Sequence, residues 1–260
     1  MGYALITGAS KGIGKAIAEE LAKRDYDLLL VARSESLLKS VAKDIHETQG
    51  VKVATLAIDL SEVDVARKVL AWVQSKGYEV SILVNNAGYG LVGEFEGYSI
   101  EDNRNMMTLN MNTLVELCQV FLPMLKKQPK SYILNIASST AYQALPMMSV
   151  YAATKVFVLN FSRALKYELR KSSVSVTSVS PGATTTEFND RANLGEKARK
   201  AAEKVTMTPA DVAKIGVDGM FNGKAEVITG IVNKVGAAFA WLLPKAIVES
   251  VAGGIYEDKK

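Results

Sequence analysis

The chain has 260 residues, of which 48% are hydrophobic and 22% are charged, and its formal net charge is +4. These values are ordinary for a globular protein and exclude a disordered chain or a disulfide-rich scaffold. The positive charges are scattered, without the dense runs of a nucleic-acid-binding arm, so we expect no nucleic-acid partner. A mildly basic surface suits a phosphate-bearing ligand.

Cys118 is the only cysteine and His46 is the only histidine. One residue of each type excludes disulfides within the chain, structural zinc sites, Cys-His dyads and Ser-His-Asp triads. We therefore expect no metal site, and a catalytic acid or base other than histidine.

The two ends of the chain bear on its location. A strand-like pattern follows Met1 at once, with no charged and then apolar leader, so we expect a cytoplasmic protein. The longest apolar stretch, residues 235–251, is interrupted by Pro244, Lys245 and Glu249, and we expect no membrane span. This stretch instead predicts a packed or amphipathic tail over residues 235–260.

Short apolar, β-branched segments alternate with longer helical patterns, which is typical of parallel βαβ winding. The expected strands are 4–7, 27–32, 52–57, 82–85, 132–137 and 174–180, with a weaker seventh near 225–229. The expected helices are 14–24, 34–48, 61–76, 103–127, 151–170 and 209–222, with capping residues such as Ser61 and Thr208. The pattern predicts an α/β fold: one doubly wound Rossmann-type domain over residues 1–260, with a parallel sheet of about seven strands and helices on both faces.

One polar segment, residues 184–207, departs from this alternation because it is rich in alanine, lysine and glutamate. It fits a substrate-covering lid or an ordinary surface helix equally well.

A glycine-rich turn directly follows the first expected strand, with Gly8, Gly12 and Gly14 in the sequence TGASKGIG. Gly8 permits a tight turn, Gly12 allows the backbone to approach a pyrophosphate, and Gly14 allows close helix packing. The spacing differs from the usual dinucleotide fingerprint, and glycine turns also join strands to helices in many other folds.

After the second expected strand, Ala32 and Arg33 occupy the position where NAD-binding folds have a carboxylate for the ribose hydroxyls. Arg33 and Lys11 are available to pair with a 2′-phosphate, which favours NADP over NAD. The alternative is that Arg33 is a solvated charge at the strand end.

Tyr151 and Lys155 are four residues apart on an expected helix, so they project from the same face. A neighbouring ammonium group favours the phenolate form of tyrosine, which makes Tyr151 a usable acid or base. Alone, this spacing is also common in plain surface pairs.

Three motifs occur together: the glycine turn, Asn85-Asn86-Ala87-Gly88, and Tyr151-Ala-Ala-Thr-Lys155. With them the chain resembles the classical short-chain dehydrogenase/reductase family, from the first strand to about Asn222. Its apolar C-terminal stretch is similar to the broad bacterial NADP-dependent reductase branch. That tail could close the pocket, form an oligomer interface or rest on a membrane surface; we favour the first two because basic residues are sparse there.

The resemblance implies four catalytic residues: Asn110, Ser138, Tyr151 and Lys155. Ser138 lies thirteen positions before Tyr151 and would polarise a substrate carbonyl, with Ser139 as its competitor. Asn110 would help to hold a water linked to the lysine, with Asn112 as its competitor. Asparagine within a helix costs roughly half a kcal/mol relative to alanine, which indicates a local reason for its presence.

The resemblance also implies a cofactor set in which Asp59 contacts the adenine, although Asp59 also fits a helix-opening carboxylate. Thr184 and Thr186 would meet the carboxamide and the phosphate. The expected NADP-binding residues are Gly8, Ser10, Lys11, Gly12, Ile13, Gly14, Arg33, Asp59, Leu60, Asn86, Ala87, Gly88, Tyr151, Lys155, Pro181, Gly182, Thr184 and Thr186.

The implied activity is NADP-dependent hydride transfer to or from a carbonyl or secondary alcohol, in EC 1.1.1. Substrate contacts are expected from residues 89–95, 141–148 and 184–207, where Leu145, Met147, Met148 and Phe188 predict an apolar pocket; ordinary packing is the alternative. A non-catalytic NADP sensor or a partner-binding protein remains the alternative function. The resemblance further implies a homodimer or homotetramer through the helices expected at 103–127 and 151–170.

Overall fold

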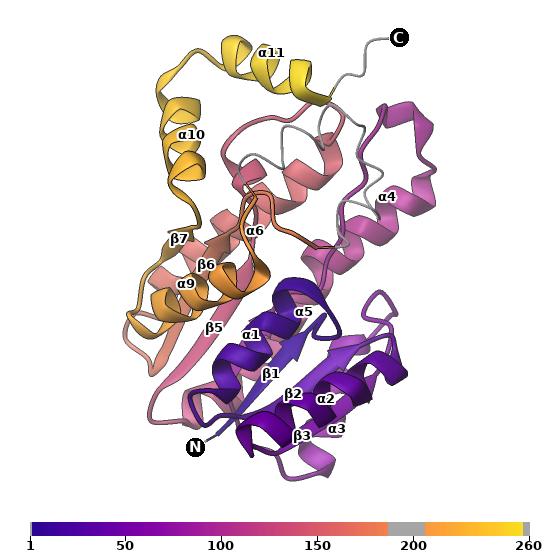
Figure 1. Ribbon diagram of the computed structural model, residues 1–260, viewed down its shortest axis with the longest axis vertical. Coiled ribbons are helices and arrows are strands. Elements are labelled where there is room, and N and C mark those ends of the chain that lie inside the picture. Colours follow the sequence, from indigo (N-terminus) through magenta and orange to yellow (C-terminus); the bar gives the residue numbers. More distant parts are fainter. Residues whose placement is uncertain (1, 187–205, 257–260) are drawn as a thin grey trace.

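Seven short strands form the centre of the molecule in the computed structural model, which describes residues 2–186 and 206–256 (Figure 1). The strands are β1 (Tyr3–Thr7), β2 (Asp27–Ala32), β3 (Val53–Ala57), β4 (Val80–Asn85), β5 (Ser131–Ile136), β6 (Val174–Ser180) and β7 (Glu226–Ile228). Their order in the sheet is β3-β2-β1-β4-β5-β6-β7, and all pairs are parallel. The predicted seven-stranded parallel sheet is therefore confirmed.

Several helices cover the two faces of this sheet. The helices of the described residues are α1 (Gly12–Ala22), α2 (Glu35–Gln49), α3 (Val65–Ser75), α4 (Ile100–Met107), α5 (Thr113–Lys127), α6 (Ser149–Glu168), α9 (Pro209–Phe221), α10 (Ile231–Leu242) and α11 (Lys245–Tyr256). Shorter turns are η1 (Phe95–Gly97), the π-helical η2 (Thr108–Asn112) and η3 (Ser139–Tyr142).

Two separate apolar cores result from the alternation of side chains along the strands. In β1, Ala4 and Ile6 point to the face covered by α1, α2 and α9, whereas Leu5 points to the face covered by α3, α5 and α6. All three side chains are fully buried. Because both faces are covered, the strand sequences are apolar on both sides, as expected for a doubly wound fold.

The sequence order of the strands reverses direction between β1 and β4, which are neighbours in the sheet. In open parallel sheets a crevice forms at such a switch point, outside the carboxyl ends of the strands. The turns that follow β1 and β4 contain the two glycine-bearing motifs found in the sequence. The fold thus brings these motifs to one edge of the sheet.

Several predicted boundaries need correction. The first helix begins at Gly12 rather than Gly14. Ser61 does not cap a helix, because its N–H and hydroxyl both donate to Asp59, and α3 begins only at Val65 after the left-handed residue Asp64. Thr208 does cap α9, where its hydroxyl accepts from the Asp211 N–H.

The predicted helix over residues 103–127 is interrupted. It starts earlier, at Ile100, because Ser99 and Asp102 form a reciprocal capping box, and it contains the π-helical turn η2 before α5. The apolar tail is helical, as α10 and α11, on either side of the short break at Leu243-Pro244. None of the helices in residues 2–186 and 206–256 combines the length and apolar character needed to cross a bilayer.

Candidate active site

The glycine turn joins the end of β1 to the start of α1. Gly12 has φ +58°, a left-handed conformation that L side chains rarely adopt, and a Cβ on Gly14 would overlap the carbonyl oxygen of Gly8. Lys11, which precedes α1, makes no side-chain cap to the first turn of the helix. The N–H groups of Gly8 and Ala9 donate to the Val31 carbonyl oxygen, and the positive end of the α1 dipole lies at this turn, which favours an anion there.

Asn86 holds this turn in place from the neighbouring strand end. Its side-chain amide donates to the carbonyl oxygens of Thr7 (2.9 Å) and Gly8 (3.2 Å). In return, the Thr7 hydroxyl accepts from the N–H groups of Asn86 (2.9 Å) and Ala87 (3.1 Å). The ends of β1 and β4 are thus bonded reciprocally, which fixes the Asn86–Gly88 turn against the glycine turn.

Ser138 and Tyr151 approach the crevice from two other elements. Ser138 follows β5, and its hydroxyl accepts from the Thr140 N–H at 3.2 Å. Tyr151 lies in the first turn of α6 and is buried among apolar side chains. Ser139, the competing serine, is the first residue of η3 and also lines the cavity.

Lys155 lies one helical turn after Tyr151, and its Nζ is 5.7 Å from the centre of the Tyr151 ring. Lys155 as a residue is 5% exposed, and its ammonium group donates to the Ile136 carbonyl oxygen at 2.9 Å. Burial away from water lowers the pKa of Lys155 from its usual 10.5 to about 8. The two side chains of the Tyr-x-x-x-Lys pair are therefore neighbours in a buried setting.

Asn110 lies beneath the crevice in the π-helical turn η2 and is almost fully buried. Its amide donates to the Tyr89 carbonyl oxygen (2.9 Å) and to the Thr154 hydroxyl (3.1 Å), and its carbonyl accepts from the Tyr89 N–H (3.1 Å). A Cβ on Gly88 would lie 2.8 Å from Asn110 Oδ1 and 3.6 Å from Lys155 Nζ. Asn112, the competing asparagine, is exposed.

Arg33 and Asp59 stand together at the far end of the crevice, with Arg33 Nη1 4.0 Å from Asp59 Oδ2. Asp59 also accepts from the N–H and hydroxyl of Ser61, so it orders the loop before α3 without capping the helix itself. Arg33 remains 60% exposed in this arrangement. Its guanidinium therefore retains donors for a further anion.

These groups surround one cavity of about 680 Å³ at the carboxyl edge of the sheet. Of the predicted site residues, those that line it are Gly8, Ser10, Lys11, Gly12, Ile13, Arg33, Asp59, Leu60, Asn86, Ala87, Gly88, Ser138, Tyr151, Lys155, Pro181, Gly182, Thr184 and Thr186. Asn110 and Gly14 do not line the cavity; Asn110 supports its wall, and Gly14 packs α1 against the turn. The structure thus brings the predicted residues together, and their roles remain predictions.

The cavity suits an elongated molecule with phosphate groups. Glycines at the helix terminus leave room for backbone N–H donors, and a Cβ on Gly12 would lie 3.2 Å from Thr186 Cγ2 on the opposite wall. Lys11 and Arg33 are two positively charged residues that line the same cavity. A nicotinamide dinucleotide fits this set of donors and charges.

The part of the site that is predicted to hold the substrate is apolar. Tyr151 packs in a cluster with Val92, Leu145, Met148 and Ala252, the last from α11. Met147 has φ 65°, and its carbonyl accepts from the Gly93 N–H at 2.8 Å, which joins two of the predicted substrate segments. Phe188 and residues 187–205 of the predicted lid lie outside the described residues.

Sequence reasoning did not identify three polar residues that hold the site together. Thr7 and Thr154 make the contacts described above, and Tyr142 donates to Glu226 Oε1 at 2.7 Å and lies 3.0 Å from the Ser180 hydroxyl. Thr7 and Thr154 could have been identified from the sequence, because each directly precedes a predicted site residue, Gly8 or Lys155. Tyr142 lies within the predicted substrate segment 141–148, but its contacts with Ser180 and Glu226 were not predicted because these partners are far away in the sequence.

Comparison with known proteins identifies the family. Residues 2–197 match the family model for short chain dehydrogenase. The chain therefore belongs to the short-chain dehydrogenase family.

A very-long-chain 3-oxoacyl-CoA reductase from Danio rerio is 35% identical over 190 residues, which cover 72% of this chain and 59% of that protein. The match thus spans about three fifths of that relative's length.

Two solved structures illustrate the shared fold. A short-chain dehydrogenase from Sphingobium yanoikuyae in complex with NADPH superimposes with a TM-score of 0.82 at 30% identity, covering 93% of this chain and 95% of that chain. A short-chain dehydrogenase/reductase from Burkholderia phymatum in complex with NAD has a TM-score of 0.81 at 23% identity, covering 92% of each chain. The second likeness shows the fold alone.

Proposed function

We propose that this chain is an NADP-dependent oxidoreductase that reduces a carbonyl group on a small to medium apolar substrate, with Tyr151 as the proton donor. The observation that carries the proposal is the single cavity that contains the glycine turn, Ser138, Tyr151 and Lys155. Membership of the short-chain dehydrogenase family supports an oxidoreductase of class EC 1.1.1. Reduction is the preferred direction because Arg33 favours NADP, which usually drives reductions.

When bound, the nicotinamide cofactor supplies the hydride that reduces the carbonyl carbon. The Tyr151 hydroxyl gives its proton to the substrate oxygen, and the Ser138 hydroxyl donates a hydrogen bond to the same oxygen as negative charge develops there. Lys155, positively charged below its pKa of about 8, stabilises the phenolate that Tyr151 leaves behind. Oxidation of an alcohol would use the same groups in the reverse sense.

Asn110 acts by position in this proposal. Its hydrogen bonds to Tyr89 and Thr154 fix the η2 turn against the Asn86–Gly88 segment and against α6. Because a Cβ on Gly88 would approach both Asn110 and Lys155, the carbonyl of Asn110 borders the space beside the ammonium group. A water held there would connect Lys155 to the outside, as the family resemblance implies.

NADP is proposed over NAD because Arg33 and Lys11 line the cavity where a 2′-phosphate would lie. The NADPH complex of the Sphingobium relative supports this choice, whereas the Burkholderia neighbour contains NAD. A homodimer or homotetramer through α5 and α6 and a cytoplasmic location remain predictions.

The test is an NADPH-depletion screen with ketones, aldehydes, steroids and acyl thioesters, run on the wild-type protein and on Ser138→Ala. We expect depletion with at least one apolar carbonyl compound, and a loss of about 100-fold or more in kcat for Ser138→Ala. NADPH binding without depletion on the whole panel would contradict the proposal and favour the alternative of a cofactor sensor. Absence of any NADPH binding would favour a partner-binding protein on the same fold.

A further inference from the structure

A second cavity lies at the opposite edge of the sheet from the candidate active site. It has a volume of about 680 Å³ and is bounded by the segments that precede β5 and β6, the second half of α6 and the start of β7. Its cationic lining residues are Lys130, Arg163, Lys166 and Arg170. We call it the basic cavity; it is open to solvent, since Lys130, Arg163 and Arg170 are exposed.

The lining of the basic cavity contains no aspartate or glutamate. The serine hydroxyls of residues 172, 173 and 175 complete its polar surface, and Leu169 and Val174 are among its apolar walls. A cleft with one sign of charge concentrates ions of the opposite sign, because its field is not cancelled locally. The chemistry of this lining therefore favours an anion with several oxygen acceptors.

Most of these cations have no carboxylate partner. In the part of the chain that the structure describes, an ion pair is present only for Arg163, whose Nη1 lies 3.7 Å from Glu226 Oε2. Arg170 stacks on the Tyr167 ring, with its guanidinium carbon 3.9 Å from the ring centre, and Lys130 Nζ lies 5.5 Å from the Tyr132 ring. Neither ring contact supplies a negative charge, so both cations remain without a carboxylate there.

Lys166 is the innermost of the four. Its Nζ donates to the carbonyl oxygens of Gly223 (2.9 Å) and Val176 (3.2 Å), so it joins α6 to β6 and to the loop after α9. Partial burial lowers the pKa of Lys166, and no carboxylate offsets this effect. A positive charge held away from water without a counter-ion gains stability when an anion binds beside it.

We propose that the basic cavity binds a small phosphorylated molecule, whose phosphate oxygens accept hydrogen bonds from Arg163, Arg170 and Lys130. Planar guanidinium groups bind phosphate through two parallel hydrogen bonds, and lysine adds a point charge. β5 and β6 begin at the basic cavity, and their carboxyl ends lie on the side of the candidate active site. The two sites therefore lie at opposite edges of the sheet. The ligand of this cavity is therefore not the substrate or the cofactor of the proposed reaction.

The test uses inorganic pyrophosphate as the probe and nuclear magnetic resonance of the full, isotope-labelled chain as the readout. We expect saturable shifts of the backbone amide signals of residues 172–175 and 225, in addition to any shifts at the glycine turn. In the double variant Arg163→Gln/Arg170→Gln, affinity at residues 172–175 should fall by about tenfold or more. The spectrum of each variant also reports whether the variant is folded.

A matched control is Arg67→Gln/Arg104→Gln, which removes the same amount of charge far from the basic cavity in sequence. Arg67 of α3 and Arg104 of α4 are exposed, and each pairs with a carboxylate three residues earlier, Asp64 and Glu101. This control should leave affinity at the basic cavity unchanged. Lys130→Gln, which breaks no ion pair, should weaken binding severalfold, and so should higher salt. Shifts confined to the glycine turn, or equal losses in the control, would overturn the proposal. Failure of the proposed reaction would not affect this result, since the readout is local to the basic cavity.

Discussion

Arg33 is the single side chain on which the proposed preference for NADP mainly rests. Its guanidinium is exposed, lies 4.0 Å from Asp59 and lines the cavity near the end of β2. A 2′-phosphate would accept charge-assisted hydrogen bonds there, whereas a ribose hydroxyl would gain little from the same cation. Removal of the guanidinium would therefore cost NADPH this contact, whereas NADH has no 2′-phosphate and would lose nothing.

We predict that Arg33→Gln lowers affinity for NADPH by about tenfold or more and leaves affinity for NADH nearly unchanged. Fluorescence titration of both cofactors measures the two constants. Arg67→Gln, which removes the same charge from an exposed side chain of α3, serves as the control. Equal weakening for both cofactors in Arg33→Gln would show that Arg33 supports the fold and does not recognise the phosphate.

Lys155 makes stability depend on pH. Its pKa in the folded ligand-free protein is about 8, below the usual 10.5, because burial penalises the ammonium form. Below pH 8 the lysine is protonated in both states and the folded state bears this penalty. Between pH 8 and 10.5 the unfolded chain holds more of the proton, so the contribution of this group to stability rises with pH.

We therefore predict that Lys155→Met is more stable than the wild type near pH 7, and that this difference shrinks by up to about 1.4 kcal/mol per pH unit above pH 8. Urea unfolding at several pH values measures the free energy of unfolding of each protein. Subtracting one pH dependence from the other cancels the contributions of titratable groups that both proteins share. Lys39→Met, at an exposed position, should show no such trend. A difference that does not vary with pH would contradict the burial of a charged Lys155.

At the scale of the element, the β1-α1 turn combines conformation and close packing. A Cβ on Gly14 would meet backbone, the Gly8 carbonyl group, and the Asn86 amide that bonds the same turn. Backbone atoms cannot move aside without disturbing the end of β1. This position therefore requires glycine for space.

We predict that Gly14→Ala lowers the free energy of unfolding by about 1 to 3 kcal/mol and weakens cofactor binding as well. Gly236→Ala is the matched control, because nothing lies within 4 Å of a Cβ there and the residue is inside α10. Alanine at that position should stabilise by about 0.5 to 1 kcal/mol. Thermal unfolding of both variants compares the two effects, and an undisturbed Gly14→Ala protein would disprove the close approach.

The sequence predicted the strands well because each is a short apolar run bounded by turn residues. The order of the strands was not predicted, since it depends on contacts between segments far apart in the chain. Helix starts were less predictable: Ser61 has the residue type of a cap, yet it is bonded to Asp59, and the Ser99–Asp102 capping box was present in the sequence but overlooked. The π-helical turn at Asn110 has no local sequence signature.

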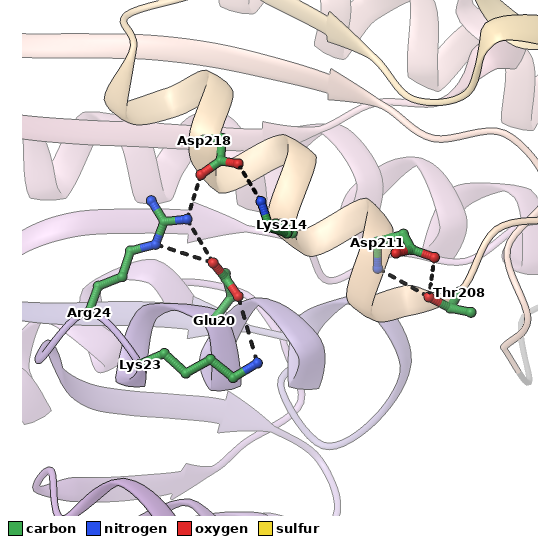
Figure 2. A network of polar contacts seen from close by, with 7 residues as sticks. All are labelled: Glu20, Lys23, Arg24, Thr208, Asp211, Lys214 and Asp218. Carbon is green, nitrogen blue, oxygen red and sulfur yellow. Dashed lines mark hydrogen bonds and ion pairs between the residues drawn. The ribbon is translucent and has the colours of Figure 1, made fainter.

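In the molecule as a whole, polar contacts of Arg24 connect α1 to α9 on one face of the sheet (Figure 2). Arg24 Nη2 donates to Glu20 Oε1 at 2.7 Å and also to Asp218 on α9. The guanidinium carbon lies 5.2 Å from the centre of the Phe221 ring. Since Phe221 and Asp218 belong to α9 and Glu20 to α1, one side chain joins segments almost 200 residues apart.

We predict that Arg24→Met lowers the free energy of unfolding by about 1 kcal/mol, since the pair is only partly buried. Hydrogen bonding to Arg24 lowers the pKa of Asp218, so this stabilisation is present at neutral pH and is lost as the pH falls through that lowered value. Urea unfolding of Arg24→Met, Asp218→Asn and the double variant gives the coupling free energy between these two side chains. Additive effects of the two substitutions would show that the contact between Arg24 and Asp218 does not stabilise the fold.

The C-terminal helices α10 and α11 combine an exposed apolar surface with a contact at the candidate active site. They expose several large apolar side chains: Ile231, Val232, Val235, Phe239, Trp241, Leu242, Leu243, Ile247 and Val251. Ala252 of α11 packs in the cluster that contains Tyr151, which supports a role at the substrate pocket. The alternatives of an oligomer interface and a membrane surface remain open.

We propose that Tyr151 transfers a proton at a site where NADPH is bound. Substitution by phenylalanine removes the hydroxyl and keeps the ring that packs with Val92 and Met148. The most direct measurement is therefore stopped-flow oxidation of NADPH by wild type and Tyr151→Phe with the same carbonyl substrate, beside fluorescence titration of NADPH. The account predicts nearly equal NADPH affinity and a rate constant lowered by about 100-fold or more in the variant. Near-normal turnover by Tyr151→Phe would contradict it.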